Sequence, residues 1–139
     1  MDLAEALDRL KRARVGRLAT LGAKGAPHIV PVTFAAVGDE LVHMIDQKPK
    51  TTRRLARLDN IERHPQATLL VDHYEEEWDR LWWVRVDGGA TVVSDGPRVE
   101  LAREALESKY PQYRQAPPRG PAIYLTMEVV RYWESARPS

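Results

Sequence analysis

A run of basic residues marks the point where the middle of the chain changes from a strand pattern to a helix pattern. Within ten residues it gathers five cations and two hydroxyls, at Lys48, Lys50, Thr51, Thr52, Arg53, Arg54 and Arg57. A helix beginning near Thr51 would bring Lys50, Arg53 and Arg57 to one side. Its first turn would add unpaired amides and the positive end of the helix dipole. This arrangement predicts a corner that binds phosphate. A merely solvated basic helix surface remains the alternative.

A pair of adjacent tryptophans could provide the flat surface that a planar ligand needs. Trp82 and Trp83 stand on a predicted strand, so one side chain faces the core and the other faces outward. An outward tryptophan beside Arg85 would be either a subunit contact or a stacking platform. Both interpretations remain open for this pair.

The second predicted strand contains a proline that cannot take part in a normal sheet ladder. Pro31 lacks an N–H, so it must lie at an edge, at a bulge, or where the strand faces something other than a neighbouring strand. The backbone around Val32 and Thr33 could then meet a ring system edge-on. Met44 on the adjacent strand could form the floor of such a site, although a buried methionine often only fills the core.

Motifs for catalysis by side chains are absent from the sequence. It has no G-x-S-x-G, H-E-x-x-H, Walker or G-x-G-x-x-G pattern, and zero cysteines exclude disulfides and thiolate metal sites. Four histidines lack metal-ligand spacing: His28, His43, His64 and His73. We therefore predict no metal site and no catalytic side chain, so that any reaction belongs to a bound cofactor.

Length and composition limit the class of protein. The 139 residues (15.8 kDa) suffice for one domain, and 43% hydrophobic with 29% charged residues is typical of a folded one. A net charge of +1 argues against a nucleic-acid partner. No apolar run reaches the roughly 18 residues of a membrane span. The charged start of the chain lacks a signal-peptide core, so we expect a cytoplasmic protein without a membrane partner.

Hydrophobic periodicity predicts the elements that must position these residues. A capped amphipathic helix opens the chain, with Asp2 and Glu5 as its capping pair. Later helices are expected at 51–64 and 97–110, and residues 113–121 as a loop. Strands are predicted at 14–21, 28–37, 40–46, 66–74, 81–94 and 122–133, with Gly88 and Gly89 as either a turn or a bulge. The order favours a small closed or split antiparallel barrel with helices outside.

Several stretches together resemble a known family. Residues 17–21 (RLATL), the glycine turn 22–25 and residues 27–32 (PHIVPV) are similar to the opening hairpin of the pyridoxamine 5′-phosphate oxidase-like, FMN-binding split barrels. Residues 57–65 (RLDNIERHP) and 83–90 (WVRVDGGA) resemble the helix and the long bent strand of its branch of coenzyme F420-dependent enzymes. The resemblance covers nearly the whole chain.

The resemblance implies a mainly β, α+β fold: a six- to seven-stranded antiparallel split β-barrel with peripheral helices, forming a homodimer. Residues 1–139 would be one flavin- or deazaflavin-binding domain with cofactor sites at the subunit interface. The implied phosphate contacts are Lys50, Thr51, Arg53 and Arg57. The implied ring contacts are Pro31, Val32, Thr33 and Met44, with Trp83 of the partner subunit closing the site.

The implied function is a coenzyme F420-dependent oxidoreductase. It would transfer a hydride between a reduced deazaflavin and a planar, electron-poor small molecule, with a proton from water or a tyrosine. FMN is the alternative cofactor. A noncatalytic flavin- or heme-binding protein of the same fold, or a structural dimer without a ligand, is the alternative class.

Overall fold

A computed structural model describes residues 1–46 and 55–136 of the chain. Its helices are α1 (Leu3–Arg12), α2 (Ala56–Arg63), α3 (Pro97–Lys109) and α4 (Pro111–Gln115), with a short 3-10 turn, η1 (Trp78–Arg80). Its strands are β1 (Gly16–Leu21), β2 (Pro27–Val32), β3 (Ala35–Val37), β4 (Glu40–Met44), β5 (Gln66–His73), β6 (Trp82–Val93), β7 (Ala122–Thr126) and β8 (Val129–Glu134). None of these helices is long and apolar enough to cross a membrane.

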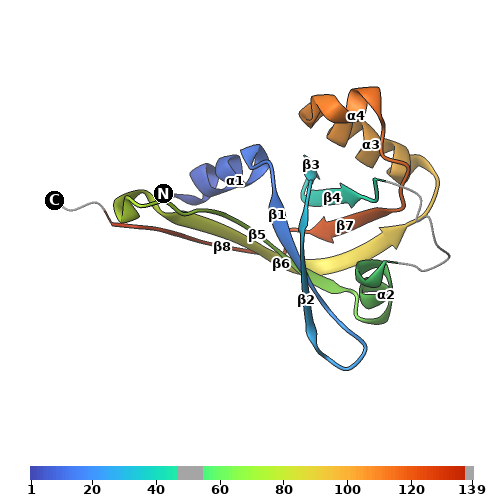
Figure 1. Ribbon diagram of the computed structural model, residues 1–139, viewed down its shortest axis with the longest axis horizontal. Helices are drawn as coiled ribbons and strands as arrows, with labels where there is room; N and C mark the ends of the chain where they lie inside the picture. Colours follow the sequence, from blue (N-terminus) through green and yellow to red (C-terminus); the bar gives the residue numbers. More distant parts are fainter. Residues whose placement is uncertain (47–54, 137–139) are drawn as a thin grey trace.

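All strand pairs are antiparallel, in the order β2-β1-β5-β6-β7-β4-β3, and β8 also pairs with β6. In Figure 1, β5, β6 and β8 run side by side as an arm toward the left, while α3 and α4 stand above β3, β4 and β7 at the right. The predicted mainly β, α+β fold with helices outside an antiparallel sheet is confirmed.

The long strand β6 joins the arm to the rest of the sheet. Its first half pairs with β5 and β8, and residues from Ala90 onward pair with β7. At the bend, a Cβ on Gly88 would overlap the carbonyl oxygen of Thr126, so only glycine allows the two strands to approach this closely. Gly88 and Gly89 therefore belong to one bent strand, which was one of the two predicted possibilities.

Two predicted strands are each divided, so the described residues form eight strands instead of six to seven. Between β2 and β3, the backbone N–H of Phe34 donates to the hydroxyl of Tyr110 instead of a neighbouring strand. Between β7 and β8, the N–H of Met127 donates to the carbonyl of Asp39. Each break is caused by a contact from a distant part of the chain.

The predicted loop at 113–121 is also partly wrong, because α4 begins at Pro111.

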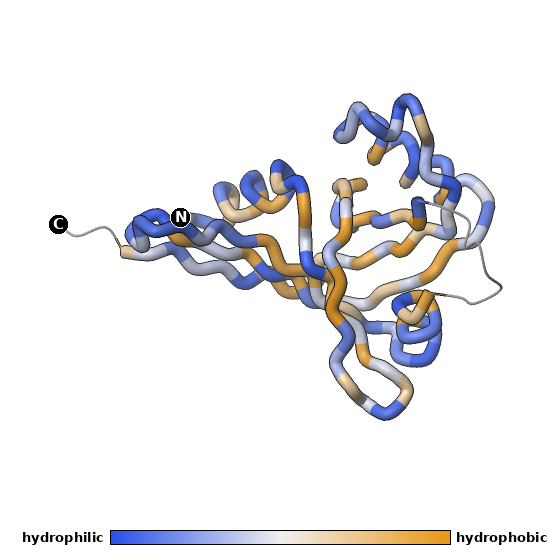
Figure 2. The backbone as a smooth tube through the Cα atoms, viewed as in Figure 1, coloured by the Kyte–Doolittle hydropathy of each residue, from blue (hydrophilic) through white to orange (hydrophobic). Residues whose placement is uncertain are grey.

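Two clusters of buried side chains lie on different parts of the sheet. One joins α1 and α2 to β1, β5 and β6, and the other joins α3 and α4 to β3, β4 and β7. Figure 2 shows hydrophobic segments concentrated along the central strands and polar segments on the outer faces of the helices. Lys109 at the end of α3 contacts the chain before β1 and after β2, because its amino group donates to the carbonyls of Ala13 and Phe34.

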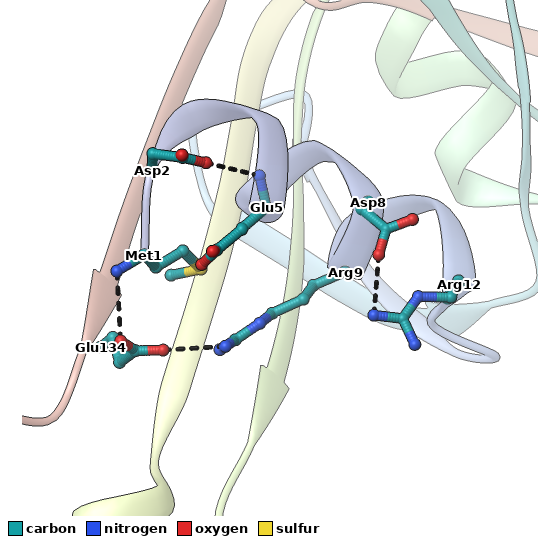
Figure 3. Close-up of polar contacts among 7 residues, drawn as sticks. All are labelled: Met1, Asp2, Glu5, Asp8, Arg9, Arg12 and Glu134. Atoms are coloured by element: carbon teal, nitrogen blue, oxygen red, sulfur yellow. Dashed lines mark hydrogen bonds and ion pairs between the residues drawn. The ribbon is translucent and has the colours of Figure 1, made fainter.

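The first helix is fastened to the last strand. Asp2 accepts a bond from the backbone N–H of Glu5, which confirms the predicted cap. The amino group of Met1 and the guanidinium of Arg9 both contact the carboxylate of Glu134 on β8, at 3.2 and 2.8 Å (Figure 3). These contacts lower the pKa of Glu134. The two ends of the described chain therefore lie together.

Candidate functional site

A buried histidine joins β4 to two other elements. His43 lies 2.9 Å through Nδ1 from the carbonyl oxygen of Thr33, and 3.2 Å through Nε2 from Nε of Arg57. Because an arginine Nε only donates, Nε2 must accept and Nδ1 must carry the proton that it donates to Thr33. Burial, and then the nearby Arg57, lower the pKa of His43 to about 4. The imidazole is therefore neutral at physiological pH.

The arginine held by this histidine stands at the start of α2. Arg57 is half-buried, and burial lowers the pKa of its guanidinium, while the carboxylate of Asp46 acts in the opposite direction. Arginine nonetheless remains charged in proteins. Within the described ranges, no ion pair joins Arg57 to a carboxylate. Its hydrogen bond to a neutral partner orients the charge without cancelling it.

A second series of hydrogen bonds also includes Thr33, which lies between β2 and β3. The hydroxyl of Tyr113 on α4 lies 2.7 Å from Oγ1 of Thr33 and 2.5 Å from Oδ1 of Asp46. A carboxylate only accepts, so Tyr113 donates to Asp46 and Thr33 donates to Tyr113. Burial, followed by the bond to Asp46, raises the pKa of Tyr113 to about 12. Thr33 thus connects the His43–Arg57 pair to the Tyr113–Asp46 pair.

A pocket opens beside this network. It has a volume of about 620 Å³ and lies between the linker after α1, the end of β4 and the start of α4. The rings of Tyr110 and Tyr113 meet edge to face at 5.6 Å and form part of its wall. Thr33 and Asp46 supply hydrogen-bonding groups, and Arg14 supplies a cation. An apolar pocket with a few convergent polar groups is the usual form of a small-molecule site.

The sequence-derived site residues other than Trp83 divide into four groups. Pro31 and Val32 end the outermost strand β2 and Thr33 follows it, so the edge position, one of three that the sequence left open for Pro31, is confirmed. Arg57 lies close to them through His43. Met44 is fully buried among core residues of the second cluster, so its side chain does not line a surface site. Lys50, Thr51 and Arg53 fall outside the described residues.

The predicted start of the central helix needs correction. Leu55 has an extended backbone, with φ −66° and ψ 138°, and α2 begins only at Ala56. A helix continuous from Thr51 through Leu55 is therefore wrong. Lys50 and Arg53, the other members of the expected stripe with Arg57, lie outside the described residues. The extended Leu55 separates Arg57 from the residues before it, and Leu55 makes no side-chain cap.

Three polar residues of the site were not found from the sequence. His43 resembled a core residue of a predicted strand, Asp46 stood at that strand's end, and Tyr113 fell in a predicted loop. Tyr113 is 67 residues away from Asp46 and 80 from Thr33 along the chain. A useful clue was available for His43 alone, since it is the one ionisable residue inside the apolar run of β4.

Trp82 and Trp83 lie on opposite faces of the arm, as alternation predicted. Trp82 packs against the first core cluster beneath the guanidinium of Arg9. Trp83 lies 5.8 Å from the guanidinium of Arg85 and is paired with Trp133. Trp83 therefore belongs to a different surface from the His43 network within this chain.

That surface is an open face of the sheet, formed by side chains that stand opposite one another on five strands. Three rows cross it: Ile29, Ala19, Thr68, Asp87 and Val129; Pro31, Arg17, Leu70, Arg85 and Arg131; and Asp72, Trp83 and Trp133. Ile29 is 63% exposed and Trp133 41%. Nε of Arg85 is buried without a hydrogen-bond partner in the part of the chain that the structure describes. We name these rows the open sheet face.

Comparisons with known proteins agree with this architecture. The family model described as pyridoxamine 5′-phosphate oxidase matches residues 3–134. A conserved hypothetical protein of Mycobacterium tuberculosis is 22% identical with a TM-score of 0.78, over 96% of this chain and 85% of that one. No match was found among curated proteins.

Two other similar structures have ligands in their names. A FAD-binding protein of Mesorhizobium loti is 21% identical, with a TM-score of 0.72 over 98% of this chain and 96% of that one. A heme binding protein of Mycobacterium smegmatis is 20% identical, with a TM-score of 0.73 over 94% and 53%. At these identities the likeness concerns the fold, whereas the family match spans nearly the whole sequence. The chain belongs to the pyridoxamine 5′-phosphate oxidase family and has its split-barrel fold.

Proposed function

We propose that this protein is a coenzyme F420-dependent oxidoreductase acting on a planar, electron-poor small molecule. When bound, the reduced deazaflavin would supply the hydride. The protein would bind and orient both molecules and exclude water, because neither the sequence nor the described residues provide an evident nucleophile. The known FAD-binding relative supports a flat redox cofactor, and the family match supports the same class.

The observation that carries the proposal is the bond between Arg57 and neutral His43. A half-buried guanidinium is costly unless its charge is compensated. Here the partner at Nε is neutral, and the carboxylate of Asp46 acts on Arg57 without forming an ion pair among the described residues. A phosphate would provide the missing charge through charge-assisted hydrogen bonds. The described residues therefore fit a cofactor with an anionic tail.

The flat part of the cofactor is proposed to lie against the end of β2. This strand lies at one edge of the sheet, so one side of its backbone has no neighbouring strand. Pro31 offers no N–H there, while backbone groups around Val32 and Thr33 can meet the edge of a heterocycle. Thr33 is itself fixed by His43 and Tyr113, which limits the movement of this wall.

We further propose that two copies assemble through the open sheet face. An exposed set of apolar and aromatic side chains of this extent is unusual for a monomer. Alternating arginines and carboxylates give the face the mixed character of a self-complementary interface. Trp83 of the partner subunit would then close over the cofactor site. The buried Nε of Arg85 has only a 3.5 Å ion pair with Asp87 and no hydrogen bond among the described residues, which supports a partner group at this surface.

FMN is the alternative cofactor, and the two differ in their tails. The deazaflavin carries an additional lactyl and glutamyl chain, so a longer basic surface favours it. Lys48, Arg54 and Arg57 of the basic run are proposed to line that surface. Of these, Arg57 is in the described region, where it fits either phosphate. The preference for F420 therefore depends on the basic sequence that precedes α2.

A noncatalytic ligand carrier is the second candidate, supported by the similar heme binding protein. His43 is poorly suited to coordinate heme iron because both ring nitrogens are already engaged. Titration of the purified protein with F420, FMN and heme separates the candidates. Fluorescence quenching with F420 or FMN, followed by reduction of a quinone by protein loaded with the reduced cofactor, would support the oxidoreductase. Heme binding with a Soret band and no flavin or deazaflavin binding would overturn it.

A further inference from the structure

The pocket beside α4 is separate from the residues proposed to hold the cofactor but shares Thr33 with them. It has a volume of about 620 Å³, within the usual range of small-molecule sites. Thr33 is the last of the proposed cofactor contacts on β2 and the residue that follows it. Its hydroxyl is hydrogen-bonded to Tyr113, which donates to Asp46, and all three residues line the pocket. A molecule in this pocket would therefore adjoin the ring of a cofactor lying on β2.

We propose that this pocket binds the electron-accepting substrate and selects planar conjugated carbonyl compounds that also carry a hydroxyl or N–H group. This inference rests on the function proposed above. It adds a location, a set of recognising residues and a hydrogen-bonding requirement for the substrate. The requirement follows from the direction of the hydrogen bonds around the pocket.

The acceptor side of the pocket is the carboxylate of Asp46. Asp46 is exposed, and one of its oxygens accepts the bond from Tyr113. An ionised carboxylate has two oxygens with about four acceptor sites, so it can accept a further bond from a ligand. The Tyr113 hydroxyl donates to Asp46 and accepts a hydrogen bond from the hydroxyl of Thr33, which fixes the carboxylate in place. A ligand with a donor group matches it.

The donor side is Arg14, whose position is fixed by α3. Its Nη1 donates to the carbonyl of Lys109 at 2.8 Å, and its guanidinium stands 5.6 Å from the ring centre of Tyr110. The hydroxyl of Tyr110 in turn lies 2.9 Å from the carbonyl of Arg14. The guanidinium has five N–H groups, and the bond to Lys109 uses one of them. A carbonyl oxygen is the matching ligand group.

The walls between these two groups favour a flat molecule. Tyr110 and Tyr113 are both less than a tenth exposed, and their rings pack edge to face. Pro111 and Gln112 at the start of α4 complete the lining. Aromatic walls with one acceptor and one donor select a planar ligand with complementary groups.

Two probes that differ in one hydroxyl test this inference on the full-length protein. 4-Hydroxybenzylideneacetone has a conjugated carbonyl and a phenol, and benzylideneacetone lacks the phenol. Binding of each is measured by calorimetry, with and without FMN, at a pH where the phenol is protonated. Asp46→Asn removes the charge and keeps an oxygen for Tyr113. Asp95→Asn, in the connection between β6 and α3, is the control for charge.

We expect the wild type and Asp95→Asn to bind the hydroxylated probe about tenfold more tightly than the other probe. In Asp46→Asn this preference should fall to about twofold, with little change for benzylideneacetone. Equal binding of the two probes by the wild type, or a preference retained in Asp46→Asn, would overturn the inference. If FMN and F420 fail to bind while the hydroxyl preference persists, the proposed function fails, and the pocket binds such carbonyl compounds without a role in hydride transfer.

Discussion

Arg57 on α2 donates its Nε–H to Nε2 of His43 on β4 across 3.2 Å. The second nitrogen of the same ring is bonded to the carbonyl of Thr33, which directly follows the edge strand β2. One buried ring thus sets the orientation of a cation and fixes the backbone beside it. This relationship joins the two halves of the proposed cofactor site.

Replacing His43 tests whether the orientation of Arg57 matters for anion binding. Glutamine can still accept the Nε–H of Arg57, whereas leucine of similar size cannot. We expect His43→Leu to weaken FMN binding about tenfold and His43→Gln by less than about threefold, since one charge-assisted hydrogen bond separates them. Fluorescence quenching measures both affinities, and circular dichroism verifies folding. Equal affinities of wild type and His43→Leu would show that the histidine has no positioning role.

The low pKa of His43 also predicts how stability depends on pH. The unfolded chain protonates His43 near pH 6.5 and the folded chain only near pH 4. The stabilisation associated with the neutral ring is therefore complete above pH 6.5 and is lost as the pH falls toward 4. From the size of the shift, its maximum is on the order of 3 kcal/mol.

Urea unfolding of the wild type and His43→Gln across this range isolates the effect from the other histidines. The difference in unfolding free energy between the two proteins should narrow or change sign steadily on acidification, because only the wild type loses this contribution. A difference that stays constant between pH 6.5 and 4 would mean that His43 titrates normally in the folded protein.

Gly88 should be the most sensitive glycine of the bent strand. Any side chain there meets the carbonyl of Thr126, a backbone atom that cannot move without disturbing β7. Gly88→Ala should cost at least about 3 kcal/mol, as expected when strain is forced into a packed region. Gly89→Ala is the matched control, because its Cβ would approach the flexible carboxylate of Glu128 at 3.2 Å. Thermal unfolding should rank Gly88→Ala well below Gly89→Ala, and the reverse order would refute this account of the bend.

The local chemistry of the chain predicted much of this arrangement. Asp2 caps α1, and Trp82 and Trp83 face opposite ways, as their sequence neighbours alone suggest. The edge position of Pro31 was one of three possibilities. The bend at Gly88 was one of two possibilities. Each of these features depends on contacts within a few residues or on strand alternation, so the sequence pattern reports it directly.

The features that escaped prediction depend on distant contacts. The break at Phe34 is made by Tyr110, 76 residues away, and Tyr113 reaches the site through Asp46 and Thr33. Periodicity also placed the central helix too early, because basic residues before Leu55 favour a helix as readily as those after it. The strand that contains Met44 was predicted correctly, but the side chain of Met44 is buried in the core. No local pattern distinguishes these outcomes.

The open sheet face predicts a dimer that a single charge can separate. Ile29→Glu places a carboxylate in a side chain that is 63% exposed in one chain and would be covered in the dimer. Light scattering should give twice 15.8 kDa for the wild type and 15.8 kDa for the variant, since burying an unpaired charge is costly. Leu101→Glu, on the exposed side of α3, should remain dimeric. A wild type of 15.8 kDa, or a dimeric Ile29→Glu protein, would count against this interface.

The most direct test of the central claim is the affinity of Arg57 variants for F420 and FMN. Arg57→Gln removes the charge, and Arg80→Gln removes an exposed one from η1 as the control. We predict that both cofactors bind the wild type and Arg80→Gln, and that Arg57→Gln weakens them about tenfold to a hundredfold, as expected for the loss of a charged hydrogen bond. Unchanged affinity in Arg57→Gln, or no binding of either cofactor to the wild type, would contradict the account.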